Sequence, residues 1–306
     1  MRRDRCGFAT PLAGRYHRKS FRSFARGTST NGTGLAGALM APPPSNAGRV
    51  QPGRVTVRAV IAALMSEPAV SSGQVSQLLR GHEADVVDVD GNWLRLRGAD
   101  EYEGWCHSGY VTREPAIDAP LQAAWRAERR MSIGCVVRTA ATVEIELPLG
   151  ALLAPDEAVT RGLAMNHRAR ARYFAPDADL IVQRATELFA GAPYQWGGVT
   201  PWGADCSGFV QTMFALHGTQ LPRDAWMQAE RGREITGDIV DLEPADMLFF
   251  SDRNDGRPTH VALSMGGAAF AHCSLANGGF GINALDAEDA VASGLRETFR
   301  FARRVL

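Results

Sequence analysis

The chain has 306 residues, 45% of them hydrophobic and 22% charged, and its 33 basic residues balance its 33 acidic ones. This composition is typical of a soluble enzyme, and the length predicts about two domains with cores of their own. No stretch reaches the ~20 apolar residues that a membrane-spanning helix needs, and five cysteines without regular spacing argue against an oxidised disulfide framework.

The N-terminal segment carries the charge imbalance of the chain. Residues 1–40 hold eight of the basic residues and one of the acidic ones, a net charge of +7 that leaves −7 on the other 266. A basic tail could contact an anionic polymer. Residues 22–49, however, are rich in Ser, Thr, Gly, Asn and Pro, which favours a solvated extension or a start codon assigned too early. We therefore expect residues 1–49 to form a disordered tail with no nucleic-acid partner.

Localisation is predicted from the same segment. Its one apolar run, Gly34 to Ala41, is eight residues long and contains two glycines, which is short for the hydrophobic region of a signal peptide. We expect a cytoplasmic protein that does not associate with a membrane. Export to the periplasm or cell surface is the alternative.

A β-rich region begins near Val55. Three valines within residues 86–89 lead into the turn Asp90-Gly91-Asn92, and residues 93–97 lead out with alternating apolar and polar side chains. This pattern predicts a β-hairpin with an Asp-Gly turn. A further strand is expected over residues 104–111.

Two segments of this region carry a resemblance to a known module. Residues 77–81 and 102–105 resemble a bacterial SH3-like barrel, which we place at residues 50–116. Residues 117–174 resemble a second, more divergent copy, with residues 147–150 as its best anchor. The sequence therefore predicts two small β-barrels before the C-terminal region.

The stretch Asp205-Cys206-Ser207-Gly208 places a cysteine where a loop becomes a helix. The preceding loop is glycine-rich, and apolar residues at helical spacing follow until Gly218. Cys206 is therefore predicted in the first helical turn. There, unpaired backbone N–H groups and the positive end of the helix dipole favour a thiolate, the form that a cysteine nucleophile needs.

Two histidines follow on predicted strands. Residues 259–267 have the pattern of a buried strand closed by a glycine turn, and residues 269–273 have that of its hairpin partner. His260 and His272 can then be neighbours across one ladder. With Cys206 they would form a Cys-His-His triad, in which His260 is the base and His272 fixes its tautomer.

The cysteine and the two histidines could have a structural or metal-binding role instead. The two histidines could be core residues, or they could bind zinc with Cys206, Asp205 and Cys273. No paired ligand spacing of the CxxC or HExxH kind is present, so no metal is expected. The remaining cysteines are expected to be structural: Cys6, Cys106, Cys135 and Cys273.

The ordered set of motifs resembles the NlpC-type cell-wall peptidases, papain-like cysteine peptidases that cleave peptidoglycan stem peptides. The resemblance covers about residues 175–306 and rests on 194–198, 205–208, 221–224, 246–250, 259–261 and His272. It implies an α+β fold in which a papain-like catalytic domain follows the two SH3-like barrels. It also implies a cysteine peptidase that needs no metal or organic cofactor.

Two SH3-like modules before such a domain resemble the γ-D-glutamyl-L-diamino acid endopeptidases, which act on stem peptides with a free N-terminal L-alanine. In that subgroup the first barrel lies against the catalytic cleft and closes the side that would accept longer substrates. The resemblance implies peptide trimming in muropeptide recycling. The expected partner is therefore the stem peptide L-Ala-γ-D-Glu-diamino acid.

A closed pocket must neutralise the substrate's amino terminus, since a buried unpaired ammonium is very costly. Asp205 is the expected carboxylate, and it can also be the helix N-cap. Tyr102 matches the family's substrate-facing tyrosine. The other expected substrate-binding residues are Ser207, Glu83, Arg223 and Asp224.

The chain departs from the subgroup at two of these positions. The barrel motif usually has Gly-Glu, whereas Gly81-His82-Glu83 displaces the acidic residue by one position, which reverses its face in a strand. After Arg223-Asp224 the subgroup tends to carry serine, whereas Ala225 removes that hydroxyl.

The resemblance implies a mechanism in which Cys206 attacks the γ-D-glutamyl carbonyl. Tyr194 and the backbone N–H of Cys206 would hold the oxyanion, and His260 would protonate the leaving amine and then activate water. Three alternatives remain: an exported wall-cutting endopeptidase, a catalytically inactive wall-peptide-binding protein, and an acyltransferase or amidase on the same fold.

Overall fold

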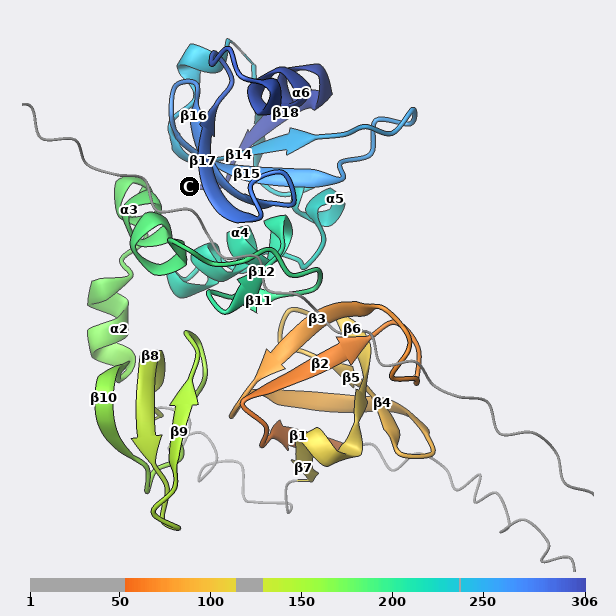
Figure 1. The fold of residues 1–306 in the computed structure, drawn as a ribbon, viewed down its shortest axis with the longest axis vertical. Coiled ribbons are helices and arrows are strands. Elements are labelled where there is room, and N and C mark those ends of the chain that lie inside the picture. The colour runs from red at the N-terminus through yellow and green to blue at the C-terminus, as the bar shows by residue number, and fades with distance from the viewer. Residues whose placement is uncertain (1–52, 114–128, 237) are drawn as a thin grey trace, which may run out of the picture. The chain divides into compact units, whose positions relative to one another are not determined.

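The computed structural model describes residues 53–113, 129–236 and 238–306 (Figure 1). The predictions for the tail at residues 1–49 and for Cys6 lie outside these residues. Among the helices of the described ranges, none is long and apolar enough to cross a membrane.

The first part of the described chain is a seven-stranded antiparallel sheet with the order β3-β2-β6-β5-β4-β1-β7. Asp90 pairs with Trp93 across a two-residue turn in which Gly91 has a φ of 55°, so the predicted hairpin is confirmed. Apolar side chains from alternate strand positions fill its core. The elements are β1 (Gly53–Val57), β2 (Ile61–Met65), β3 (Gln74–Leu79), β4 (Glu83–Asp90), β5 (Trp93–Arg97), β6 (Glu103–His107), η1 (Ser108–Tyr110) and β7 (Val111–Arg113).

The second barrel is not confirmed. The described residues of this part form a three-stranded antiparallel sheet, followed by the short helix α2 (His167–Tyr173). Its core includes Leu79 of β3 and Val199, the first residue of β11 (Val199–Thr200), so the sheet completes its apolar cluster with residues from other parts of the chain. The strands, in the order β10-β8-β9, are β8 (Met131–Arg138), β9 (Glu144–Leu147) and β10 (Ala158–Met165).

The C-terminal part is built on a six-stranded antiparallel sheet with the order β13-β18-β14-β15-β16-β17. The strands are β13 (Arg233–Ile235), β14 (Pro244–Phe250), β15 (His260–Gly266), β16 (Ala269–Ser274), β17 (Gly279–Ala284) and β18 (Phe299–Arg304). The remaining elements are α3 (Ala178–Phe189), β11 (Val199–Thr200), β12 (Gly203–Ala204), α4 (Cys206–Leu216), α5 (Ala225–Gln228), η2 (Ile239–Asp241) and α6 (Ala290–Thr298).

Both faces of this sheet are buried, because its central strands are apolar at consecutive positions. On β14, Met247 and Phe249 join a core with α3 and α4, whereas Leu248 and Phe250 join a second cluster on the opposite face. The two predicted strands around the histidines are present and pair as β15 and β16. The two histidines therefore lie on adjacent strands of the sheet, one on each strand of this hairpin.

Candidate active site

Cys206 is the first residue of α4 and is buried. Asp205 caps the helix, because its Oδ1 accepts a hydrogen bond from the backbone N–H of Gly208 at 2.7 Å. A Cβ at Gly208 would lie 2.1 Å from the carbonyl oxygen of Gly198, so glycine lets the first helical turn pack directly on the preceding loop. Local sequence thus places the sulfur at the positive end of α4.

His260 and His272 come together across the β15–β16 hairpin. Nε2 of His260 lies 2.8 Å from Nδ1 of His272, which places the second histidine where it can orient the first. Cys206 lies against Val261, the residue after His260, and a backbone hydrogen bond from Val261 acts on its sulfur. The structure therefore joins the two histidines to each other and places Cys206 beside the residue that follows His260.

Asp205 has a partner that the sequence did not indicate. Its Oδ1 and Oδ2 accept hydrogen bonds from Nη1 and Nη2 of Arg223 at 3.1 and 2.7 Å, and Oδ2 also accepts one from Gly197 N at 2.8 Å. Arg223 is only 1% exposed, and its Nη1 also donates to Oγ of Ser207 at 2.9 Å. The carboxylate expected to bind substrate is thus neutralised by a buried arginine, and Ser207 and Arg223 belong to the same internal network.

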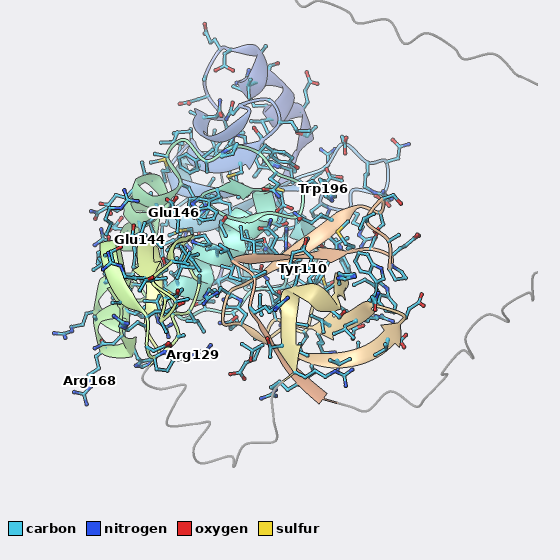
Figure 2. All side chains as sticks on the ribbon, turned by 60° about the horizontal axis from the view of Figure 1, so that its bottom comes forward. Tyr110, Arg129, Glu144, Glu146, Arg168 and Trp196 are labelled. Carbon is cyan, nitrogen blue, oxygen red and sulfur yellow. The ribbon has the colours of Figure 1, made fainter. Side chains whose placement is uncertain are left out.

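The first domain reaches the catalytic loops through β3. Gln74 Nε2 donates to the carbonyl oxygen of Trp196 at 2.9 Å, and Ser76 Oγ accepts from Nε of Arg223 at 3.2 Å. The Trp196 side chain itself is 68% exposed (Figure 2). Strand β3 therefore holds both the loop before Cys206 and the arginine that pairs with Asp205.

Tyr102 makes a second link to this region. Its hydroxyl donates to Oδ1 of Asp224 at 3.2 Å, and Nε1 of Trp226 donates to Oδ2 at 3.3 Å. Burial, reinforced by the Asp224 carboxylate, raises the pKa of Tyr102 to about 12, so the hydroxyl stays protonated and able to donate. Two expected substrate-binding residues are therefore in contact, one from each domain.

Two family models match the chain, and they match it in the two regions just described. The model described as NlpC/P60 family covers residues 191–291, which include Cys206, His260 and His272. The chain carries an NlpC/P60 cysteine-peptidase domain. The model described as bacterial SH3 domain covers residues 55–112, so the first of the two predicted SH3-like modules is confirmed.

Curated relatives extend over more of the chain than this NlpC/P60 domain. The dipeptidyl-peptidase 6 of Lysinibacillus sphaericus is 28% identical over 256 residues, which are 75% of this chain and 91% of that protein. A gamma-D-glutamyl-L-lysine dipeptidyl-peptidase of Bacillus cereus is 28% identical over 232 residues, which are 64% of this chain and 66% of that protein. A gamma-D-glutamyl-L-lysine dipeptidyl-peptidase of Bacillus subtilis is 40% identical over 96 residues, which are 31% of each chain.

A solved structure shows the same fold. It is a NlpC/P60 family protein from Bacillus cereus, and it superposes with a TM-score of 0.66 at 20% identity. The match covers 83% of this chain and 99% of that one. The arrangement of an NlpC/P60 domain after an SH3-like region is therefore shared between the two proteins.

Burial sets the protonation states of the triad. It raises the pKa of Cys206 to about 12, and the Asp205 carboxylate acts in the same direction, whereas the Val261 hydrogen bond and Arg223 lower it. Burial, with a contribution from His272, lowers the pKa of His260 to about 3. The preformed thiolate expected from the helix dipole is thus opposed by desolvation. Burial thus favours the thiol and the neutral imidazole, and proton transfer to His260 during attack would start from these forms.

Tyr194 lies beside the nucleophile. Burial raises the pKa of its phenol, and the nearby Cys206 raises it further. The backbone N–H of Tyr194 donates to the carbonyl oxygen of Gly278 at 3.0 Å, which ties this loop to the β16–β17 turn. Its hydroxyl is therefore a protonated donor next to the sulfur.

The neutral histidines predict acid sensitivity. Burial also lowers the pKa values of His272, His82 and His217. Below the unfolded pKa of about 6.5 the unfolded chain binds more protons at these histidines than the folded one, so the free energy of unfolding falls as the pH falls. We expect the free energy of unfolding in urea to drop between pH 7 and pH 5.

The control is substitution of an exposed histidine. His167→Gln should leave the slope of stability against pH unchanged, whereas His272→Gln should reduce it, because only His272 is buried. A wild-type stability that is flat from pH 7 to pH 5 would contradict neutral burial of these residues.

Glu83, an expected substrate-binding residue, pairs with two arginines. It begins β4, and its carboxylate lies 3.6 Å from Nη1 of Arg54 and 3.5 Å from Nη1 of Arg129. His82 stands one position earlier, and its Nε2 lies 3.2 Å from the carbonyl oxygen of Gly150. The inserted histidine thus faces the three-stranded sheet, and the acidic residue pairs with arginines.

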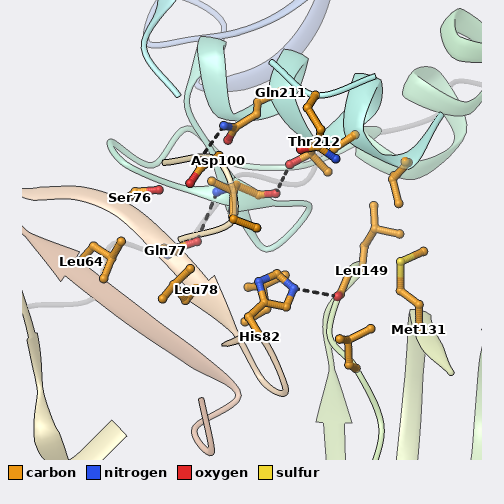
Figure 3. A pocket seen from close by; sticks show the side chains of 18 of the residues that line it. Leu64, Ser76, Gln77, Leu78, His82, Asp100, Met131, Leu149, Gln211 and Thr212 are labelled. Atoms are coloured by element: carbon orange, nitrogen blue, oxygen red, sulfur yellow. Dashed lines mark hydrogen bonds between the residues drawn. The ribbon is translucent and has the colours of Figure 1, made fainter. Parts of the chain in front are cut away.

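A cavity of about 360 Å³ lies behind α4 and is lined by residues of β3, the three-stranded sheet and α4 (Figure 3). Its lining includes neither Cys206 nor His260. The polar groups in it bond one another, as when Nε2 of Gln211 donates to Asp100 at 2.9 Å. This cavity is therefore separate from the candidate active site. Within the described ranges, no three His, Cys, Asp or Glu residues converge as a metal site.

The sequence motifs do not indicate two asparagines that contact His272. Asn277 and Asn283 contact Nε2 of His272 from the β16–β17 hairpin. They follow the histidine motif without any spacing typical of a catalytic group. Only the pairing of β17 with β16 could have indicated them.

Proposed function

We propose that this NlpC/P60 peptidase hydrolyses the γ-D-glutamyl–L-diamino acid bond of peptidoglycan stem peptides that carry a free N-terminal L-alanine. The observation that carries the proposal is the hydrogen bond from Tyr102 of the SH3-like domain to Asp224, the residue after the arginine that pairs with Asp205. It supports a substrate site to which the first domain contributes and which admits only a short peptide. The names of the relatives, gamma-D-glutamyl-L-lysine dipeptidyl-peptidases, support the same bond.

The proposed reaction uses the described triad. His260 accepts the proton of the Cys206 thiol as the sulfur attacks the γ-carbonyl carbon, and the tetrahedral oxyanion forms next to the Cys206 N–H and the Tyr194 hydroxyl. The C–N bond then breaks, and His260 returns the proton to the leaving amine. Water, deprotonated by the same histidine, hydrolyses the thioester and frees Cys206.

The substrate's ammonium group is best matched by Asp224. Asp205 already has a buried guanidinium bound to both of its oxygens. The hydrogen-bond donors to Asp224 are neutral: the Tyr102 hydroxyl and the Trp226 indole N–H. An ammonium beside Asp224 would gain a charge-assisted hydrogen bond that Asp205 no longer has free to give. Asp205 instead keeps Arg223 and the helix N-terminus in place beneath the site.

Product analysis tests this function. Incubation with L-Ala-γ-D-Glu-L-Lys should release the dipeptide L-Ala-D-Glu and free lysine, read by mass spectrometry. Cleavage of the other peptide bond, between L-Ala and D-Glu, would instead release L-alanine and the dipeptide γ-D-Glu-L-Lys. Release of alanine, or an intact tripeptide with enzyme that is folded by circular dichroism, would contradict the proposed bond.

Localisation is part of the same proposal. Peptides with a free amino terminus arise after the wall has been degraded, so we propose a cytoplasmic enzyme of peptide recycling. Efficient digestion of intact cross-linked peptidoglycan by the full-length protein would instead support an exported wall-cutting enzyme.

A further inference from the structure

The ring of His272 is held on its far side by two asparagines. Its Nε2 lies 2.9 Å from Oδ1 of Asn283 and 3.0 Å from Nδ2 of Asn277. Nδ2 of Asn277 also donates to Oδ1 of Asn283 at 2.7 Å. These contacts continue, on the side away from His260, the pair formed by Nε2 of His260 and Nδ1 of His272.

The direction of these hydrogen bonds decides whether His260 can act as a base. A neutral imidazole has one donor and one acceptor nitrogen. If Nε2–H of His272 donates to Asn283, Nδ1 of His272 accepts from Nε2–H of His260, and Nδ1 of His260 keeps its lone pair. If instead Nδ1–H of His272 donates to Nε2 of His260, the proton of His260 is on its Nδ1. That nitrogen then cannot accept a proton from Cys206.

We propose that Asn283 is a positioning residue of this active site, whose side-chain carbonyl selects the Nε2–H tautomer of His272 and, through it, the basic tautomer of His260. Asn277 supports the arrangement, because an N–H of its Nδ2 donates to the Asn283 oxygen and holds that oxygen toward His272. In this tautomer the 3.0 Å approach of the same Nδ2 to Nε2–H of His272 is a packing contact and not a hydrogen bond. The inference rests on the proposed catalytic roles of His260 and His272.

The β16–β17 register shows that the position is built for this contact. His272 pairs with Gly281, and Phe270 pairs with Asn283, so Asn283 stands on the same face of the sheet as His272. A Cβ at Gly281 would lie 2.3 Å from Nδ2 of Asn277. The glycine opposite His272 therefore leaves the space through which the Asn277 amide reaches the ring.

The half-buried amide of Asn283 is a suitable acceptor for the fully buried ring of His272. His272 is fully buried, and burial lowers its pKa, so its neutral form is the stable one. A neutral acceptor orients the ring without adding a charge that would need a counter-ion. The relay from Asn283 to His260 thus consists of neutral groups until Cys206 gives up its proton.

The test combines substitution with ¹⁵N NMR of labelled histidines, read without substrate. In the wild-type protein both His260 and His272 should be Nε2–H tautomers. Asn283→Leu keeps the volume and removes the acceptor, so His272 should lose that tautomer. The kcat should fall about ten- to a hundredfold with KM within about twofold, a smaller loss than the roughly 10²- to 10⁴-fold that general acid–base catalysis supplies.

Asn283→Asp restores an acceptor and should recover the tautomer and most of the lost kcat. Asn254→Leu, at an exposed asparagine of the β14–β15 loop, is the matched control and should change neither. If Asn283→Leu does not fold, Gly281→Ala displaces the Asn277 amide and should weaken the tautomer preference. An unchanged tautomer in the folded variant, or equal losses of kcat in the Asp and Leu variants, would overturn the inference.

The NMR measurement also separates this inference from the proposed function. A tautomer that changes as expected, in a protein that cleaves no γ-D-glutamyl peptide, would count against the function and leave the role of Asn283 supported.

Discussion

Replacement of Cys206 by alanine is expected to abolish peptide hydrolysis while the fold remains intact. The side chain is the nucleophile of the proposed reaction, and neither water nor a neighbouring side chain can replace the thioester route. We expect kcat to fall by more than about 10³-fold, as for other residues that act as one unit with a base. The cap of α4 is made by Asp205 and should survive the substitution.

Cys273 is the matched control for this result. It is a free cysteine, fully buried on β16, in the same apolar cluster as Cys206. Cys273→Ala should keep most of the activity, and iodoacetamide should inactivate this variant as it does the wild-type protein. Normal turnover by Cys206→Ala, or loss of activity only in the Cys273 variant, would show that the nucleophile has been misassigned.

The parts of the site that are local in sequence could be predicted. The loop-to-helix transition at Cys206 is encoded by nearby glycines and by apolar spacing, and both appear in the structure. The meeting of His260 and His272 required only a hairpin between adjacent strands. Such short-range patterns fix backbone geometry before any tertiary contact is considered.

The parts of the site that depend on long-range contacts could not be predicted from the sequence. Arg223 meets Asp205 and Ser76, residues 18 and 147 positions away, and no local pattern encodes that meeting. Because a buried ion pair is costly to break, the pairing of Arg223 with Asp205 makes Asp205 part of an internal network and not a free binding site for the substrate ammonium. The residues expected to bind substrate thus divide into an internal network and the Tyr102–Asp224 pair.

The fold of residues 131–165 could not be predicted for another reason. Residues 117–174 resembled a second SH3-like copy, yet the core of the three-stranded sheet found there includes Leu79 and Val199. Strand patterns report which faces are apolar, but they do not say which part of the chain covers them. The number of barrels was therefore beyond what the pattern could decide.

N-Acetylation of the substrate is expected to have the largest effect of any change on the substrate side. It removes the positive charge that Asp224 would bind and adds bulk beside Asp224, to which Tyr102 is bonded. Loss of one partner of a desolvated charge pair costs about 2–5 kcal/mol, so kcat/KM should fall on the order of 10²- to 10³-fold. A generic wall endopeptidase, which accepts substituted amino termini, would not discriminate in this way.

Asp224→Asn identifies the contact responsible. Asparagine keeps the size of the side chain and an oxygen acceptor for Tyr102 while removing the charge. Two groups that act through one contact give non-additive losses. The variant should therefore lower kcat/KM strongly for the free-amine peptide and by less than about threefold for the acetylated one. Asp255→Asn, at an exposed loop carboxylate, is the matched control and should affect neither peptide.

The most direct test of the account is the ratio of kcat/KM for L-Ala-γ-D-Glu-L-Lys to that for its N-acetylated form, measured in the wild-type protein and in Asp224→Asn. We expect a ratio on the order of 10² or more in the wild type and a much smaller ratio in the variant, where only the bulk of the acetyl group still discriminates. Equal cleavage of the two peptides by the wild-type enzyme, or a ratio that Asp224→Asn leaves unchanged, would contradict this expectation.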